Sequence, residues 1–205
     1  MPDHIIRDEA TLRALYGVPG DASVMKQTEH LHPHYQAMIR LSPFAVLATV
    51  GPSGVEASPR GDAPGFAEIH DDRTLLLPDR RGNNRIDSLR NILADPRVAL
   101  LFLIPGVGET LRVNGMAEIS IDPVLLARFA VDGKLPRSVL VVHVMAVFFP
   151  CTKALVRSGL WRAEVQVARS ALPSTGTILA DISANRVGGA EYDKAAPARV
   201  RETLY

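Results

Sequence analysis

The segment Pro78-Asp79-Arg80-Arg81-Gly82-Asn83-Asn84-Arg85 places three arginines, two asparagines and a glycine within eight residues. It stands between a short apolar run and a stretch with helical apolar spacing, which predicts a strand end, a loop and a helix start. Free backbone N–H groups and the helix dipole favour an anion at a helix N-terminus. Arg85 can bind two phosphate oxygens, and Asn83 or Asn84 can cap the helix or bind the ligand. The residues indicate phosphate binding, while an ordinary solvated, capped helix start remains an open alternative.

Other residues with chemical potential are more isolated. His30, His32 and His34 alternate along the chain and could in principle bind a metal. The intervening proline and the helix expected after it work against convergence, and no cysteine or carboxylate cluster supports them. His143 lies in an apolar run, where we expect a satisfied core residue. Cys151 is the single cysteine, either a reactive thiol or, as is more usual, a small apolar filler.

Composition narrows the class of protein. The chain has 205 residues, 47% of them hydrophobic, and a net charge of +1, which argues against a protein that wraps a polyanion. We therefore expect no nucleic-acid partner. The longest apolar runs, at residues 98–105 and 139–150, fall short of the ~20 residues that a membrane-spanning helix needs. One cysteine and an N-terminus without a signal-peptide pattern favour a cytoplasmic location.

The elements that would position these residues follow from apolar spacing and turn signals. Helical stripes are expected at Thr11, Leu12, Leu15 and Tyr16, and at Tyr35, Met38, Ile39 and Leu41. Strands are predicted at residues 44–50, 55–60, 66–69, 74–77, 97–104, 111–121 and 138–149. The strand at 97–104 has no polar alternation, which predicts burial on both faces. Helices are predicted at about residues 84–94 and 123–129, with two more after residue 172.

Hairpin-connected strands with few parallel crossovers favour a closed antiparallel β-barrel over a Rossmann fold. The fold class expected is therefore mainly β with helices, a split antiparallel β-barrel that is homodimeric. We expect a helical extension over residues 1–42, a barrel over 43–165, and a helical arm over 166–205 that packs on a partner subunit.

Several motifs, taken in order, resemble the pyridoxamine 5′-phosphate oxidase-like, split-barrel flavin proteins. The stretch at residues 75–92 is similar to the segment that binds the FMN phosphate in that family. The remaining matches are Ser58-Pro59-Arg60-Gly61-Asp62, Phe102-Leu103-Ile104-Pro105-Gly106, Thr110-Leu111-Arg112-Val113-Asn114-Gly115, Cys151-Thr152-Lys153-Ala154 and Arg157-Ser158-Gly159-Leu160-Trp161. The last two resemble a bacterial branch of FMN-dependent enzymes whose substrate is unknown.

The resemblance implies a homodimer with FMN bound at the subunit interface. Asn84 and Arg85, with Asn83 beside them, would hold the phosphate. The residues expected to border the isoalloxazine and ribityl chain are Ser58, Pro59, Arg60, Gly61, Pro78 and Asp79. Thr110 stands where the founding oxidase tends to have a glutamine near the ring. Lys153 and Trp161 would reach the flavin from the partner subunit.

The function expected is a flavin-dependent oxidoreductase that acts on a small organic substrate. The founding oxidase binds its substrate with a C-terminal Arg-x-His pair, and this chain ends Arg201-Glu202-Thr203-Leu204-Tyr205 instead. Pro150 also replaces a histidine that is common in the branch. Oxidation of pyridoxamine 5′-phosphate is therefore not expected. The alternatives are a non-catalytic flavin carrier or redox sensor, a haem binder using His143 or the His30–His34 group, and a deazaflavin binder.

Overall fold

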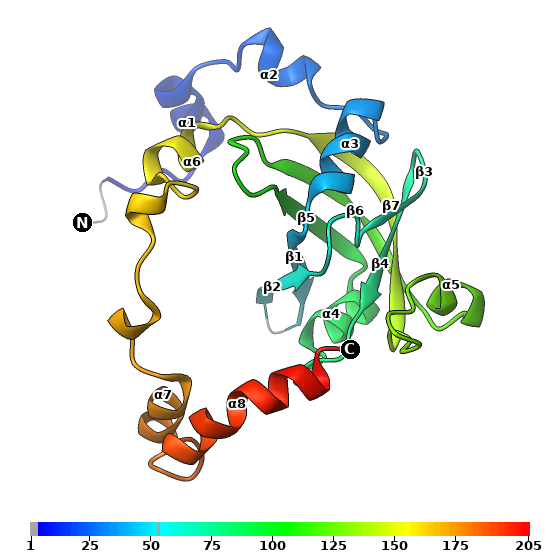
Figure 1. Ribbon diagram of the computed structural model, residues 1–205. Coiled ribbons are helices and arrows are strands. Elements are labelled where there is room, and N and C mark those ends of the chain that lie inside the picture. Colours follow the sequence, from blue (N-terminus) through cyan, green and yellow to red (C-terminus); the bar gives the residue numbers. More distant parts are fainter. Residues whose placement is uncertain (1–3, 53) are drawn as a thin grey trace.

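A single seven-stranded antiparallel sheet forms the centre of the molecule (Figure 1). The computed structural model describes residues 4–52 and 54–205. Along the sheet the strands follow the order β2-β1-β5-β6-β7-β4-β3. Their bounds are β1 (Phe44–Gly51), β2 (Gly54–Gly61), β3 (Glu68–Asp71), β4 (Thr74–Asp79), β5 (Arg97–Leu103), β6 (Leu111–Ser120) and β7 (Ser138–Phe148).

The sheet curls without closing, so the expectation of a closed barrel is wrong. β2 and β3 are its two edges, and no backbone ladder joins them in the described part of the chain. Closure by hydrogen bonding requires the edge strands to run side by side. Here β3 has only four residues and β2 pairs on one side only, with β1.

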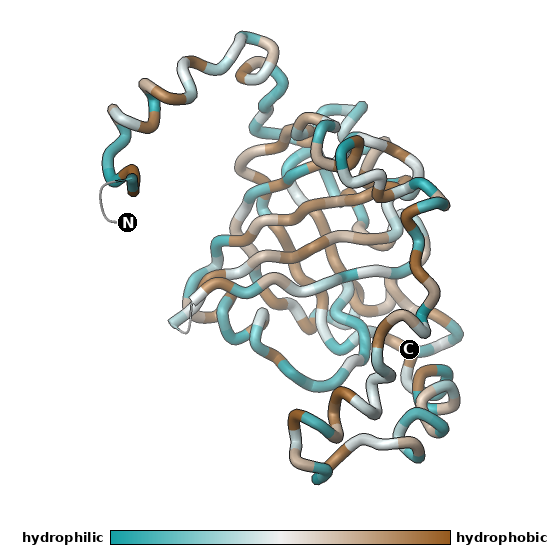
Figure 2. Tube along the Cα trace, turned by 90° about the vertical axis from the view of Figure 1, so that its left-hand side faces the viewer, coloured by the Kyte–Doolittle hydropathy of each residue, from teal (hydrophilic) through white to brown (hydrophobic). Residues whose placement is uncertain are grey.

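The core lies on the inner face of the curled sheet, where the apolar residues gather along the strands (Figure 2). Strand β5 shows how this face is built: Val98, Leu100 and Phe102 are buried, whereas Leu101 and Leu103 are only partly buried. The expectation that this strand is buried on both faces is therefore wrong. Its outward residues are as apolar as its inward ones, so composition hides an ordinary alternation of burial.

Helices cover parts of the sheet and extend the chain at both ends. They are α1 (Glu9–Tyr16), α2 (Asp21–Met25), α3 (Pro33–Leu41), α4 (Asp87–Ala94), α5 (Pro123–Arg128), α6 (Lys153–Ser158), α7 (Thr175–Ile182) and α8 (Ala190–Thr203), with 3₁₀ turns η2 (Ala163–Val165) and η3 (Arg169–Ala171). Helix α3 buries Tyr35 and Ile39 against the core. Leu41, expected on the same stripe, is exposed instead, because it is the last helical residue before the chain turns into β1.

Helix α1 has no buried residue among those described. Leu15 is 67% exposed and Tyr16 is 76% exposed on α1, and Figure 2 shows this segment projecting away from the sheet. At the other end α7 and α8 pack on each other, and the Asp193 carboxylate accepts hydrogen bonds from the Gly176 amide and the Ser174 hydroxyl. Within the described residues, no helix has the length and apolar character required to cross a membrane.

Candidate functional site

A cavity of about 510 Å³ opens between the end of β2 and the end of β4. Its walls come from the last residues of β2 with the loop after it, from the β4 end with the loop into α4 and the first residues of α4, and from the start of β7. We call it the arginine-rich cavity. Its lining consists of Ser58, Pro59, Arg60, Gly61, Asp62, Phe66, Pro78, Asp79, Arg80, Arg81, Gly82, Asn83, Asn84, Arg85, Ile86, Ser88, Leu89, Arg137 and Ser138.

Two ion pairs cross this gap in the sheet. Arg60 Nη1 lies 2.7 Å from Asp79 Oδ1, and Arg80 Nε lies 2.8 Å from Asp62 Oδ2. Each pair joins the β2 side to the β4 side, near opposite ends of the strand order. The side chains are between 7% and 21% exposed, so water screens them less than it screens surface pairs. Side chains thus hold together the part of the curled sheet that backbone hydrogen bonds leave open.

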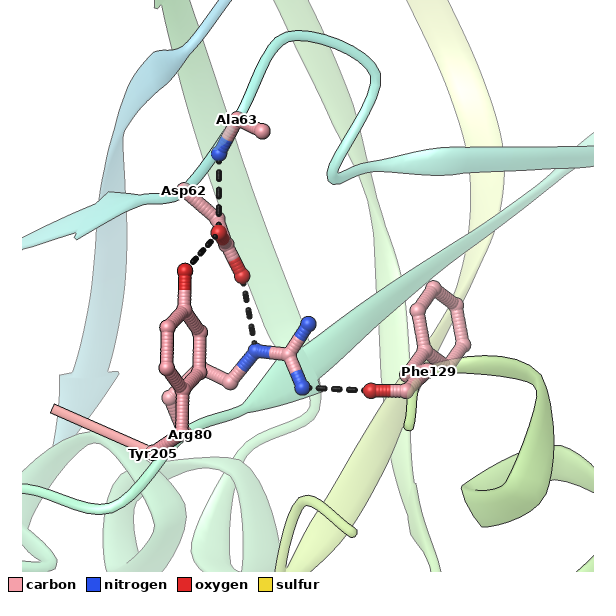
Figure 3. A network of polar contacts seen from close by, with 5 residues as sticks. All are labelled: Asp62, Ala63, Arg80, Phe129 and Tyr205. Carbon is pink, nitrogen blue, oxygen red and sulfur yellow. Dashed lines mark hydrogen bonds and ion pairs between the residues drawn. The ribbon is translucent and has the colours of Figure 1, made fainter. Parts of the chain in front are cut away.

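Asp62 is the most buried member of these pairs, with a side chain that is 7% exposed. Figure 3 shows the donors that surround it. Its Oδ1 accepts from the Ala63 amide at 2.8 Å and from the Tyr205 hydroxyl at 2.7 Å. Arg80, besides pairing with Oδ2, donates from Nη1 to the Phe129 carbonyl at 2.5 Å and lies 5.4 Å from the centroid of the Tyr205 ring.

This environment shifts the acidity of both partners. Burial alone would raise the pKa of Asp62, but hydrogen bonds from Tyr205, Ala63 and Arg80, with the Arg80 charge, outweigh it and lower that pKa. The hydrogen bond to Asp62, together with burial, raises the pKa of the Tyr205 phenol. In the hydrogen bond between them, the Tyr205 phenol is therefore the neutral donor and the Asp62 carboxylate the anionic acceptor.

The loop before α4 differs from the expected helix start. The helix begins at Asp87 rather than near Asn84, and its N-cap Ile86 supplies no side-chain bond. Asn83 Oδ1 accepts from the Arg85 amide at 3.0 Å within the loop, and Asn84 has a left-handed φ of 61°. The expectation that Asn83 or Asn84 caps the helix is wrong, because the local turn uses the Asn83 side chain first.

Arg85 is not free in this arrangement. Its Nε lies 2.9 Å from Asp87 Oδ2, and its side chain is 77% exposed. Asp87 also gives the first turn of α4 a negative charge, which opposes an anion at the helix axis. An anion in the cavity would therefore be bound by the loop and its arginines more than by the helix dipole.

The charge and hydrogen-bonding capacity of the cavity fit an anionic ligand. Five arginines and two aspartates line it, and no carboxylate among the described residues pairs with Arg81 or Arg137. Arg60 Nε is buried and has no hydrogen-bond partner within residues 4–52 and 54–205. A buried donor without an acceptor is costly, so a ligand acceptor beside Arg60 would relieve that cost. The volume lies in the range of about 300–1,000 Å³ typical of small-molecule sites.

Nine of the twelve expected cofactor residues line this cavity: Ser58, Pro59, Arg60, Gly61, Pro78, Asp79, Asn83, Asn84 and Arg85. Thr110, Lys153 and Trp161 lie elsewhere in the chain. Trp161 Nε1 donates to the Val107 carbonyl at 2.8 Å, Thr110 is buried in the same β5–β6 connection, and Lys153 begins α6. The structure therefore separates the expected residues into two groups.

Sequence reasoning missed the part played by Asp62, Phe129 and Tyr205. Asp62 stands inside a recognised motif, but its partners are far away in sequence, and Tyr205 is separated from it by 143 positions. A pattern of neighbouring residue types carries no signal for such a contact. The excess of arginine over acidic residues at 78–85 was the usable signal, and the structure places this segment in the lining of the cavity.

Of the remaining candidates, His143 has a 52% exposed side chain 3.7 Å from Glu118, so the expectation that it is a core residue is wrong. Cys151 is exposed, which contradicts the apolar-filler alternative and leaves the reactive-thiol alternative untested. His32 Nδ1 accepts from the His34 amide at 3.3 Å. Across the described ranges, no three histidines, cysteines or carboxylates gather as metal ligands would.

Comparisons with known proteins found one family model and a set of solved structures similar to this chain. The family model described as pyridoxamine 5′-phosphate oxidase matches residues 31–151. The tagged HupZ protein of Group A Streptococcus is 19% identical with a TM-score of 0.48, over 58% of this chain and 92% of its own. A Lactobacillus delbrueckii protein provisionally designated a pyridoxamine 5′-phosphate oxidase is 21% identical with a TM-score of 0.46, and the match covers 60% of this chain and 99% of that protein. An FAD-binding protein from Mycobacterium smegmatis is 14% identical with a TM-score of 0.41, and the match covers 59% of this chain and 95% of that protein. No curated protein matches the chain.

Proposed function

The chain belongs to the pyridoxamine 5′-phosphate oxidase family, whose model matches more than half of it, and from this we propose that it binds FMN in the arginine-rich cavity. We propose further that the protein is a flavin-dependent oxidoreductase acting on a small organic substrate. Family membership supports a flavin in general terms. The preference for FMN rests on the charge of the cavity.

The convergence of three separate stretches on one cationic cavity carries the proposal. Residues 58–61, 78–79 and 83–85, which the family resemblance singles out, all line it. Arg81 and Arg137 add positive charge that no described carboxylate neutralises. A terminal phosphate is the part of FMN that needs such charge, since a buried phosphate without partners is strongly unfavourable.

On this proposal, one end of the cavity binds the phosphate of FMN and the other end binds its ring system. At the loop end, Arg81, Asn84 and Arg85 would hold the phosphate through charge-assisted hydrogen bonds. At the strand end, the buried Arg60 Nε would donate to an acceptor on the ring system. Phe66 and Pro78 are buried there and would exclude water from one wall. The bound flavin would supply hydride- or electron-transfer chemistry, and the protein orients it and sets its electrostatic surroundings.

We also propose that a second copy of the chain completes the site. Thr110, Lys153 and Trp161 do not line the cavity of their own chain, and on this proposal they serve it from a partner. The exposed apolar residues of the terminal segments, including Leu15, Tyr16, Ile182 and Leu204, offer the surface for that association. On this proposal, residues 43–165 form the flavin-binding unit, and the exposed apolar residues of the extensions at 1–42 and 166–205 contact the partner.

The absorption spectrum of the purified protein tests the cofactor proposal. Flavin bands that remain through gel filtration, and are released as FMN on denaturation, are the expected result. A haem Soret band, a deazaflavin spectrum, or a protein that neither carries nor binds added FMN would each contradict it. Rapid reoxidation of the reduced flavin by an organic acceptor would then support an enzyme, whereas slow reoxidation by every acceptor would support a carrier or sensor.

A further inference from the structure

The chain after β7 runs as a strap that is fixed at two points. Trp161 anchors its start through the hydrogen bond to Val107. From residue 162 to 204, no hydrogen bond or ion pair to the sheet or its loops occurs among the described residues. The next anchor is Tyr205, whose hydroxyl reaches Asp62 at 2.7 Å. Figure 1 shows α7 and α8 carried away from the sheet and the C-terminal end brought back beside α4 and β4.

The second anchor lies directly on the wall of the arginine-rich cavity. Asp62 and Arg80 both line that cavity, and Tyr205 contacts each of them, the first by its hydroxyl and the second by its ring. Asp62 Oδ1 has two donors, the Ala63 amide and the Tyr205 hydroxyl, while Oδ2 holds Arg80 (Figure 3). If Tyr205 departs, a largely buried carboxylate oxygen loses one of its two donors.

We propose that Tyr205 is a positioning residue for the arginine-rich cavity: by holding the Asp62–Arg80 pair in the wall, it links retention of the bound ligand to docking of the strap. This inference rests on the proposed function only in taking FMN as the ligand. With Tyr205 docked, Arg80 is fixed by Asp62, by the Phe129 carbonyl and by the Tyr205 ring. With Tyr205 released, the Asp62 and Arg80 side chains can move apart and open the wall.

The strength of the contact indicates a reversible closure. One hydrogen bond to a charged acceptor and one cation–π contact hold the strap, and a hydrogen bond of this kind contributes modestly to stability. We therefore expect removal of the hydroxyl alone to speed ligand release about three- to tenfold. Release of riboflavin should be accelerated as much as release of FMN, because the effect does not act through the phosphate.

The test compares Tyr205→Phe with Tyr192→Phe in the full-length protein. Tyr192 is on α8, which ends two residues before Tyr205. Its ring lies 4.1 Å from Arg199 Cζ, but its hydroxyl has no hydrogen-bond partner among the described residues. Each variant loses one phenol oxygen: Tyr192→Phe within α8 and Tyr205→Phe just after it. The measurements are flavin fluorescence during release of FMN, amide hydrogen exchange at residues 199–205 without ligand, and the melting temperature.

Faster exchange at residues 199–205 and faster FMN release in Tyr205→Phe, at an unchanged melting temperature and with Tyr192→Phe like wild type, would support the inference. Release at the wild-type rate would overturn it, as would equal acceleration in both variants. A wild-type protein that binds no FMN would refute the proposed function instead. In that case hydrogen exchange alone would decide whether Tyr205 docks the strap, and unchanged exchange would overturn that too.

Discussion

The Arg60 guanidinium lies 2.7 Å from the Asp79 carboxylate and joins β2 to β4 across the opening of the curled sheet. Backbone ladders connect each pair of neighbouring strands in the sheet order, from β2 to β3. At this one opening, the connection depends on ionised side chains, and the same side chains line the arginine-rich cavity. Binding and stability are therefore expected to share residues here.

A double-mutant cycle on Arg60→Ala and Asp79→Ala should reveal coupling between the two side chains. Each partner is partly buried, so removing one leaves the other with an unpaired charge. We expect each single change to destabilise the fold by about 1–2 kcal/mol, with a coupling of about 1 kcal/mol. Urea unfolding of the four proteins measures it, and additive effects would show that the pair does not bridge the opening.

Arg85 and Asp87 should affect FMN affinity in opposite directions. Arg85→Ala removes a phosphate ligand and should weaken FMN binding by about 1.5 kcal/mol, near tenfold. Asp87→Asn breaks the ion pair that occupies Arg85 and removes a negative charge, so it should tighten FMN binding. Riboflavin, which lacks the phosphate, should respond to neither change in a titration of flavin fluorescence. Equal losses for FMN and riboflavin in Arg85→Ala would make this arginine structural.

The stability due to Asp62 should depend on acid pH. The pKa of Asp62 is lowered in the folded state, while an unfolded aspartate titrates near 3.9. Its stabilising contribution is therefore complete above about pH 4 and is lost as the pH falls through the lower folded-state value. The melting-temperature gap between wild type and Asp62→Asn should be wide at pH 7 and should narrow below about pH 4. Asp181→Asn, on the exposed surface of α7, should show no gap at either pH.

If two copies of the chain associate through the terminal segments, the molecular mass in solution should be that of a dimer. Sedimentation equilibrium at micromolar concentration should give about twice 22.2 kDa, because an obligate interface buries on the order of 2,000 Å² or more. Leu15→Glu on α1 should shift the protein toward monomer, whereas the same change at Leu93 on α4, which is 78% exposed against 67% for Leu15, should not. A monomer that retains FMN would exclude a site shared between subunits.

Pyridoxamine 5′-phosphate should be a poor reductant of the bound flavin. Arg80 is already engaged by Asp62 and the Phe129 carbonyl, and Arg199 stacks on Tyr192. Neither arginine is therefore available for a substrate phosphate. Anaerobic bleaching of the flavin band should be slow with this amine and faster with a reduced nicotinamide. Rapid bleaching by the amine would contradict this prediction and would restore the founding activity.

The sequence was informative wherever the pattern was local. The hairpin of β1 and β2 lies within one residue of its predicted bounds, because a Gly-Pro-Ser-Gly turn between two short apolar or β-branched runs has few alternatives. Nine of the twelve expected cofactor residues line one cavity, because their motifs stand next to turns that the fold brings together. Helix α4 begins later than predicted because the Asn83 side chain stabilises a non-helical turn first.

Relationships between distant residues could not be predicted from spacing. Nothing near Asp62 indicates that a tyrosine 143 positions away donates to it. Barrel closure was overestimated for a related reason, since strand patterns predict how many strands form but not whether the last one meets the first. The predicted burial of His143 was also wrong, as was the apolar-filler alternative for Cys151, because an apolar neighbourhood in sequence does not determine which face a residue occupies.

The strap between Trp161 and Tyr205 makes the docking of its end an intramolecular equilibrium. Tyr205 meets Asp62 at a local concentration that the length and stiffness of residues 162–204 determine, and that concentration falls roughly as the −3/2 power of length for a flexible chain. A single proteolytic cut near η3 would turn the same contact into a bimolecular one that dilution disrupts. In the intact chain, residues in η2, η3 and the segment between them do not line the cavity, yet they would govern how often it is closed.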